Sequence, residues 1–249
     1  MYQKTSKRIS SALREKGNIT KTKQDQRKDL LSDLIRLHQE RDEFTETYLR
    51  RLAVTNFGAG HETMCSTLTA AIAMIGSHPD VQRRVVDEVR HSPDSVSSDS
   101  FPYTQASIKE AQRLHPVIGM SLSRKVPEDG MFIHGTHFPA GTTVGCNPVA
   151  LHHNPDIFDV DAGEYNPDRW LQQNDGARLR VMERANLTWG GGSRACPGRH
   201  VAELVVLKVV PALLKEFDLE ITALPEEEEM PSYFMSMLTG VKARFMAAE

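Results

Sequence analysis

The chain has 249 residues, of which 39% are hydrophobic and 25% are charged, and its formal net charge is -3. A chain of this length can bury a sizeable core as one large or two small domains, and its composition excludes a disordered or membrane-embedded class. The charge balance gives no reason to expect nucleic acid as a partner. The three cysteines lack CxxC spacing, which argues against a disulfide framework or a zinc site and favours a reducing compartment.

The N-terminal segment, residues 4–28, is basic and polar with little hydrophobic periodicity. This pattern favours a solvated linker or a frayed helix. A transit peptide is the alternative, although three acidic residues count against it, and the first residues carry no apolar run of a signal peptide or membrane anchor. We therefore predict a basic polar segment over residues 1–29 and a folded region over 30–249.

Hydrophobic periodicity predicts five helices, at residues 30–37, 45–76, 79–90, 104–114 and 199–217. The second begins at a candidate N-cap, Thr45, and ends at the stop signals Gly76 and Pro79. Between residues 54 and 77 its only formal charge is Glu62. A helix that is apolar on nearly every side spans a membrane or lies buried in a large fold, and an acid near its middle argues against the span. We expect a central buried helix.

Short β elements are predicted where apolar and polar residues alternate around Gly and Pro turns. They fall at residues 120–126, 131–133, 141–144 and 241–245. Loops are predicted at 92–100 and at the acidic segment 226–229. The fold class is therefore mainly α with small β sheets (α+β).

The most informative stretch reads Trp-Gly-Gly-Gly-Ser-Arg-Ala-Cys-Pro-Gly, from Trp189 to Gly198. A cysteine between a glycine loop and the first turn of a helix lies where unpaired amides and the helix dipole favour a thiolate. The glycines let the backbone approach a flat group, and Arg194 is placed to meet an anion. Cys196 is therefore a candidate metal ligand. The alternatives are a nucleophile and a buried structural cysteine.

This stretch resembles the haem-binding signature of the cytochrome P-450 family, in which an aromatic residue, glycines and a basic residue precede the thiolate ligand of haem iron. The resemblance implies that Cys196 is the axial ligand of haem b and that Arg194 meets a haem propionate. It also implies that the loop residues Trp189, Gly192 and Gly198 flank the cofactor. The family usually has Phe at the position of Trp189, whose indole N–H either donates to the sulfur and raises the iron potential or simply packs.

The segment 59–63 resembles the middle of the family's long distal helix. Small Ala59 and Gly60 would leave room for a planar cofactor and its ligand. Glu62 would relay protons from solvent, and Thr63 would hold the water or oxygen that receives them. The structural alternative for Thr63 is a hydroxyl bonded to the carbonyl one turn earlier. The family usually has Thr or Ser at the next position, where this chain has Met64.

Glu110 and Arg113 share a helix face, and on a surface such a pair is worth only about 0.2 to 0.5 kcal/mol. In this order along the chain, the two resemble the buried Glu-x-x-Arg pair of the family. The turn 165–170 resembles its Pro-x-Arg-aromatic segment, which implies that Arg169 completes a buried structural network supporting the cysteine loop. Arg124 is either a second propionate partner or a plain strand-edge arginine.

Two adjacent histidines, His152 and His153, are poorly placed to share one metal ion. We expect both on the surface.

The resemblance covers about residues 30–245, a haem-binding C-terminal half of the cytochrome P-450 fold, most like that of filamentous-fungal members. It implies a haem-thiolate monooxygenase that uses O2 to hydroxylate or demethylate an apolar small molecule, such as an aromatic compound or secondary metabolite. Electrons would come from NADPH through a reductase at a basic face with Arg199, His200 and Lys208. The alternative is a truncated, catalytically inert haem-binding fragment. A redox-neutral peroxide rearrangement is disfavoured, because such enzymes have little need of Glu62 and Thr63.

Family members are about twice this long, and the N-terminal half that roofs their substrate pocket has no counterpart here. We therefore expect one side of the long helix to face solvent unless a partner or a second polypeptide covers it. The chain itself has no predicted membrane span. If an N-terminal anchor exists, we expect the protein at the surface of the endoplasmic reticulum membrane, and otherwise in the cytoplasm.

Overall fold

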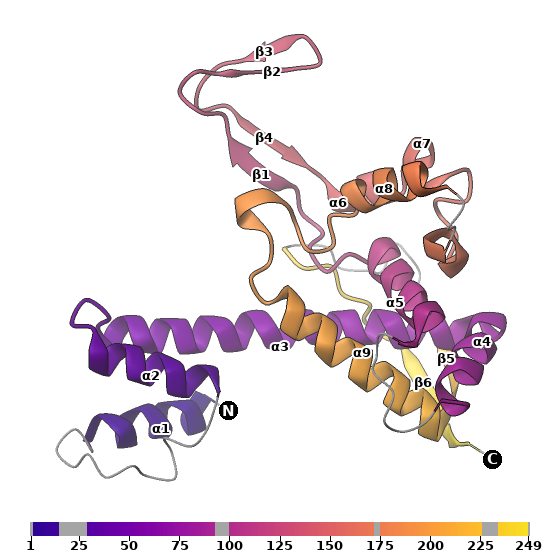
Figure 1. Ribbon diagram of the computed structural model, residues 1–249, viewed down its shortest axis with the longest axis horizontal. Coiled ribbons are helices and arrows are strands. Elements are labelled where there is room, and N and C mark those ends of the chain that lie inside the picture. The colour runs from indigo at the N-terminus through magenta and orange to yellow at the C-terminus, as the bar shows by residue number, and fades with distance from the viewer. Residues whose placement is uncertain (1, 15–28, 93–99, 172–174, 226–233, 249) are drawn as a thin grey trace. The chain divides into compact units, whose positions relative to one another are not determined.

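The computed structural model describes residues 2–14, 29–92, 100–171, 175–225 and 234–248. The chain divides into two compact units, residues 1–62 and 63–249, and helix α3 (Glu46–Ser77) contributes to both (Figure 1). The boundary predicted after residue 29 stays a prediction. Among the described helices, none is both long enough and apolar enough to cross a membrane.

The first unit contains α1 (Tyr2–Arg14), α2 (Leu30–Glu40) and the N-terminal part of α3. Its small core consists of buried aliphatic side chains: Ile9, Leu34, Ile35, Leu49 and Ala53. Helix α1 therefore contributes a buried residue to this core. Asp29 is the N-cap of α2, because its side chain accepts a hydrogen bond from the amide of Ser32 (2.9 Å).

Helix α3 begins as the sequence predicts. The Oγ1 atom of Thr45 accepts a hydrogen bond from the amide of Tyr48 (3.3 Å). Residues 54–62 are all exposed, so the prediction of a central buried helix with one side facing solvent is wrong for this stretch. The reason is that α1 and α2 pack around Leu49 and Ala53, N-terminal to this stretch.

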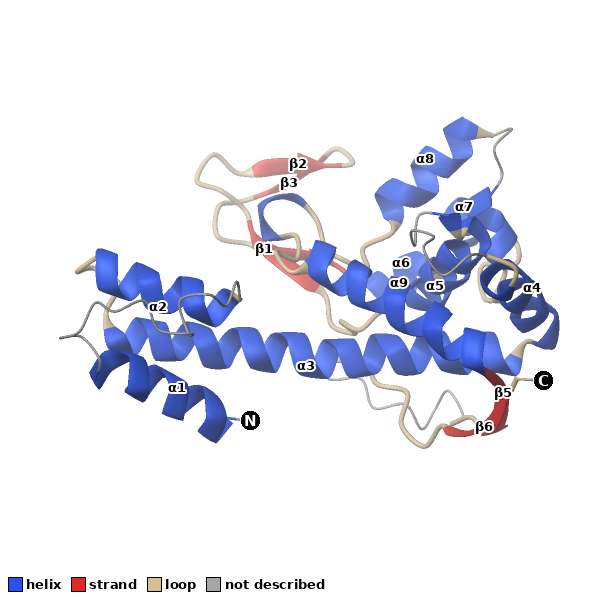
Figure 2. Ribbon diagram, turned by 60° about the horizontal axis from the view of Figure 1, so that its bottom comes forward, coloured by secondary structure: helices blue, strands red, loops and turns tan. Residues whose placement is uncertain are grey.

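The core of the second unit is formed by the end of α3, α4 (Pro79–Arg90), α5 (Pro102–Leu114), α9 (Arg199–Glu216) and β5 (Phe217–Ala223). Figures 1 and 2 both show α4, α5 and α9 beside the C-terminal part of α3. The buried residues that join these elements include Ala71, Ile75, Val85, Ala111, Val210 and Leu219. The predicted helices therefore pack through their apolar faces.

The start of α5 is fixed by a side chain of α4. The carboxylate of Glu88 accepts hydrogen bonds from the amides of Tyr103 (2.9 Å) and Thr104 (2.7 Å). These are amides of the first turn, which have no partner within the helix. Glu88 thus caps the helix that carries Glu110 and Arg113.

The strands form three antiparallel pairs among the described residues. The pairs are β1 (Leu122–Lys125) with β4 (Thr143–Cys146), β2 (Met131–Ile133) with β3 (Thr136–Phe138), and β5 with β6 (Lys242–Ala247). Strand β2 has the predicted bounds, whereas β3 and β5 were not predicted. The mainly α fold with small β sheets is confirmed.

Short helices position the remaining segments: α6 (Pro148–His152), α7 (Pro155–Phe158), η2 (Pro167–Leu171), α8 (Gly176–Ala185) and η3 (Gly192–Arg194). A separate buried cluster joins α5, α7, η2 and α8 through Ala106, Phe158, Ala162, Trp170 and Met182. Figure 2 shows α7 and α8 on the same side of α5. The segment that leads to Cys196 begins at Asn186, the C-cap of α8.

The C-terminal segment returns to the centre of the second unit. The amide of Ser236 donates to the Val117 carbonyl (2.8 Å), and its carbonyl accepts from the Ser66 hydroxyl (2.9 Å). A β-bridge joins Ile118 and Met235. The segments after α5 and before β6 therefore lie side by side. The predicted loops at 93–99 and 226–229 fall outside the described residues.

Candidate functional site

Cys196 lies between η3 and α9, and its thiol is exposed and not part of a disulfide. Its amide donates to the carbonyl of Trp189 (2.8 Å), and this bond closes the base of the glycine loop. Every residue from 192 to 200 is exposed. The structure thus presents an accessible thiol two residues before Gly198, the N-cap of the 18-residue helix α9.

Two glycines of the loop have backbone angles that side-chain-bearing residues rarely adopt. The φ angles of Gly190 and Gly192 are +70° and +61°. A third glycine lies next to the thiol: a Cβ atom on Gly198 would be 3.9 Å from the Cys196 sulfur. The glycines therefore shape the loop and keep the approach to the sulfur open.

The chemistry of these residues fits a haem iron. A thiolate is an axial ligand that haem iron accepts, and the exposed Arg194 in η3 can meet an anionic group. Arg124 is also exposed, in β1, where its guanidinium donates to the Ser123 carbonyl (2.9 Å). Its role as a strand-edge residue or propionate partner stays open.

Glu110, Arg113 and Arg169 come together in the interior of the second unit. The Glu110 carboxylate accepts from Nε (2.9 Å) and Nη2 (2.8 Å) of Arg113 and from Nε of Arg169 (2.7 Å). The side chains of Glu110 and Arg113 are 0% exposed. A surface role for the Glu110–Arg113 pair is therefore excluded.

The Arg113 guanidinium finds an acceptor for each of its N–H groups. Besides its bonds to Glu110, it donates to the carbonyls of His152 (2.5 Å), Ala162 (2.6 Å) and Glu164 (3.1 Å). A buried cation is tolerated only when its donors are satisfied in this way. Arg113 thus ties α5 to α6 and to the segment before η2.

Two further members of the network were not predicted. Trp170 donates from Nε1 to Glu110 (2.8 Å), and Arg169 is paired with the carboxylate of Asp161 (3.1 Å). Burial raises the pKa of Asp161, but hydrogen bonds from Asn166 and Arg169 outweigh it and leave the pKa below its ordinary value. The sequence offered two signals for these members: a carboxylate eight residues before Arg169, and an aromatic ring directly after it.

His152 is fully buried, so the expectation of a surface histidine is wrong for this residue. Its Nδ1 faces the Arg113 carbonyl (2.9 Å), and its Nε2 accepts from the amide of Leu187 (2.8 Å). Burial lowers the pKa of His152 to about 4. His153 is half-buried, with Nδ1 near the Val149 carbonyl (2.8 Å).

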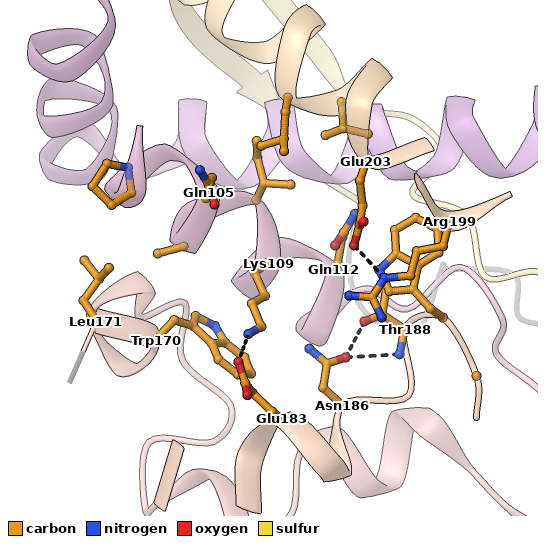
Figure 3. A pocket seen from close by; sticks show the side chains of 17 residues that line it. Gln105, Lys109, Gln112, Trp170, Leu171, Glu183, Asn186, Thr188, Arg199 and Glu203 are labelled. Carbon is orange, nitrogen blue, oxygen red and sulfur yellow. Dashed lines mark hydrogen bonds and ion pairs between the residues drawn. The ribbon is translucent and has the colours of Figure 1, made fainter. Parts of the chain in front are cut away.

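A cavity of about 710 Å³ adjoins the cysteine loop and is lined by α5, α9 and the segment 186–190 (Figure 3). In Figure 3, Lys109 points to Glu183 (3.1 Å) and Arg199 points to Glu203 (2.8 Å). Pockets for apolar small molecules are predominantly hydrophobic. Because this lining contains two ion pairs, we do not assign it as the substrate pocket.

The residues predicted on α3 lie on either side of the division between the two units. Ala59, Gly60 and Glu62 belong to the first unit and are exposed, whereas Thr63 belongs to the second and is half-buried. Their predicted roles in proton delivery and cofactor binding stay predictions.

Comparison with known proteins gives consistent matches. The model of the cytochrome P-450 family matches residues 1–245. The cytochrome P-450 monooxygenase sdnT of Sordaria araneosa is 55% identical, with 99% of this chain and 49% of the relative covered. A pisatin demethylase of Fusarium vanettenii is 36% identical, with 78% and 38% covered. A cytochrome P-450 monooxygenase of Aspergillus terreus is 34% identical, with 77% and 40% covered.

The chain spans less than half the length of each of these relatives. The match nevertheless runs through almost all of the present chain, including the cysteine loop and the residues of the buried network. The resemblance predicted from the sequence is confirmed: the chain belongs to the cytochrome P-450 family.

Proposed function

We propose that this protein takes part in haem-thiolate monooxygenase chemistry, in which one atom of O2 is inserted into an apolar small molecule. The observation that carries the proposal is the exposed, free thiol of Cys196 before α9 in a chain of this family. The relatives named monooxygenases, and the one named a demethylase, support hydroxylation or demethylation as the reaction. Their origin in filamentous fungi supports an aromatic compound or secondary metabolite as the substrate.

In this proposal the thiolate of Cys196 holds the iron of haem b. The bound haem supplies the activation of O2. Arg194 and Arg124 neutralise the propionates, and both guanidinium groups are exposed. Gly192 and Gly198 keep the backbone close to the cofactor without a side chain between them.

The proposed proton path uses neighbouring residues of α3. Glu62 is exposed, so its carboxylate can exchange protons with water, as the outer end of a relay must. Thr63 follows it directly and is half-buried, so its hydroxyl is the inner member. Ala59 and Gly60, one turn earlier, provide the space for a flat group beside the helix.

Electrons would come from NADPH through a reductase that docks near the N-terminal end of α9. Arg199 and His200 are exposed at this end, and Lys208 is exposed in the middle of the same helix. Arg199 is paired with Glu203 (2.8 Å), so a reductase carboxylate would compete for this cation. We place the protein at the endoplasmic reticulum surface if an N-terminal anchor precedes this sequence, and in the cytoplasm otherwise.

The first test is haem uptake by the full chain, followed by reduction and addition of carbon monoxide. Thiolate ligation is expected to give an absorption band at about 450 nm in the difference spectrum. Cys196→Ser should abolish this band, whereas the matched changes Cys65→Ser and Cys146→Ser, at two other exposed free thiols, should leave it intact. A band that survives Cys196→Ser, or no haem uptake at all, contradicts the proposal.

The second test separates an enzyme from an inert haem-binding fragment. Product formation that requires both O2 and NADPH with a reductase supports the monooxygenase. Haem uptake with the thiolate band but no such turnover supports the inert fragment.

A further inference from the structure

The interior of the second unit holds one imidazole that the proposed chemistry does not use. His152, the last residue of α6, is 0% exposed and lies between the end of α5 and the segment that follows α8. Its ring also packs edge-on against Phe158 (6.1 Å between ring centroids).

The hydrogen bonds of His152 fix its protonation. The Arg113 carbonyl can only accept, so Nδ1 must carry the hydrogen. The Leu187 amide can only donate, so Nε2 must offer its lone pair. His152 is therefore the neutral Nδ1–H tautomer, and the lowered pKa that burial causes agrees with this assignment.

From Leu187 a short series of backbone hydrogen bonds leads to the thiol-bearing residue. The Leu187 carbonyl accepts from the Gly190 amide (2.8 Å), and the neighbouring Trp189 carbonyl accepts from the Cys196 amide (2.8 Å). At the other end, Arg113 donates to the carbonyl of His152 itself (2.5 Å). The imidazole thus lies between the buried charge network and the cysteine loop.

We propose that His152 is a positioning residue, which sets the place of the cysteine loop relative to the network of Glu110, Arg113 and Arg169 by holding the amide of Leu187. Without an acceptor at this point, the half-buried amide of Leu187, directly after the C-cap Asn186 of α8, loses its partner, and the loop shifts to find one. The proposal rests on the proposed function only in treating Cys196 as the iron ligand. The positioning itself concerns the polypeptide and can be measured without haem.

The test is amide hydrogen exchange, resolved by residue with NMR, on the full haem-free chain. The side chains in His152→Met and His152→Gln are similar in length, but Gln offers the Leu187 amide a strong oxygen acceptor, whereas the Met sulfur is only a weak one. His153→Gln is the matched control, because the neighbouring ring is not bonded to the loop. The amide of Asn166, which donates to Glu110 (3.2 Å), reports on the network itself.

In His152→Met we expect exchange of the Leu187 amide to become about tenfold faster or more, because this half-buried donor loses its hydrogen-bond acceptor. The amides of Gly190 and Cys196 should accelerate with it, while Asn166 stays as in the wild type. His152→Gln should restore slow exchange at all three loop amides, and His153→Gln should change none of them. In the wild type, ring nitrogen shifts should identify the Nδ1–H tautomer.

Three results would overturn the proposal. One is faster exchange at Leu187 with Cys196 unchanged, since His152 would then anchor a single amide. Another is equal acceleration at Asn166, which would show that the ring only fills the core. The third is equal behaviour of the Gln and Met variants. Because no haem is needed, these outcomes are independent of the haem-uptake result for Cys196→Ser.

Discussion

Replacing Glu110 by Gln is the most direct test of the buried network. Five hydrogen bonds end on this carboxylate, from Arg113 (two), Arg169, Trp170 and the amide of Asn166. Glutamine removes the negative charge between two buried guanidinium groups and turns one acceptor oxygen into a donor. If the amide nitrogen takes the place of Oε2, the Nε of Arg113 and the indole N–H of Trp170 lose their acceptor.

The magnitude follows from those two donors. A buried donor without a partner costs about 1 to 3 kcal/mol, so two cost about 2 to 6 kcal/mol. This range contains the about 3 to 5 kcal/mol found when one member of a buried ion pair is removed. Since a domain is stable by only about 5 to 15 kcal/mol, Glu110→Gln should remove a large part of the stability of the second unit.

The assay is urea unfolding followed by tryptophan fluorescence. The two tryptophans are Trp170, within the network, and Trp189, at the loop. Glu183→Gln is the control, because its partner Lys109 and Glu183 are 34% and 52% exposed, and such a pair is worth about 1 kcal/mol or less. If Glu110→Gln lowers the free energy of unfolding no more than Glu183→Gln does, the network does not stabilise the unit and the reasoning is refuted.

Three other predictions concern separate features. The pKa of His152 falls from 6.5 to about 4 on folding, so the unfolded chain binds more protons than the folded chain between these pH values. The free energy of unfolding should therefore fall by at most about 3 kcal/mol as the pH drops through this window. Urea unfolding at several pH values should show a smaller loss in His152→Gln. Equal losses in the two proteins would contradict the assignment. Gly76→Ala should lower the stability by about 1 to 3 kcal/mol, because the new Cβ atom would lie 2.9 Å from a side-chain carbon of β5. Gly58→Ala, in the same helix but with open space around it, should instead raise the stability by about 0.5 to 1 kcal/mol. Thermal unfolding should therefore show a lower melting temperature for the first variant and a higher one for the second. Trp189→Phe should lower the reduction potential of the haem-loaded protein if the indole N–H donates to the sulfur of Cys196, and an unmoved potential in a redox titration excludes that hydrogen bond.

The helices were predictable because their apolar residues recur at helical spacing and their ends carry ordinary signals. Helix α4 has the predicted bounds, and Thr45 caps α3 as expected. Helix α5 begins two residues earlier than predicted, since Pro102 at its start suits a first turn that needs no amide donor.

Strand β5 and helix α8 are among the elements that were missed, and each was missed for a different physical reason. Strand β5 alternates apolar and polar residues, but it follows α9 without a glycine or proline, so the helical pattern hides it. Helix α8 has a single buried residue, Met182, so its apolar stripe is weak. Its signal was the N-cap Asp175, which accepts from the amide of Arg178 (3.0 Å).

The parts of the candidate site that depend on specific residue types were predictable, whereas the parts that depend on which residues are buried were not. The glycines and the cysteine identify the loop, and the spacing of Glu110 and Arg113 places both on one helix face. Whether that face is inside depends on the chain packed against it, which no local pattern states. The same holds for His152, whose burial follows from Phe158 and the end of α5.

The hydrogen bond from Ser66 to the Ser236 carbonyl joins residues 170 positions apart in the sequence. Pairing over such a separation is slow, because the entropy of closing the long loop is lost before the contact stabilises anything. On the ribosome, this contact cannot form until Ser236 has been synthesised. The core of the second unit therefore stays incomplete while the residues from 66 to 236 emerge, and a nascent chain that stops before Ser236 lacks this contact.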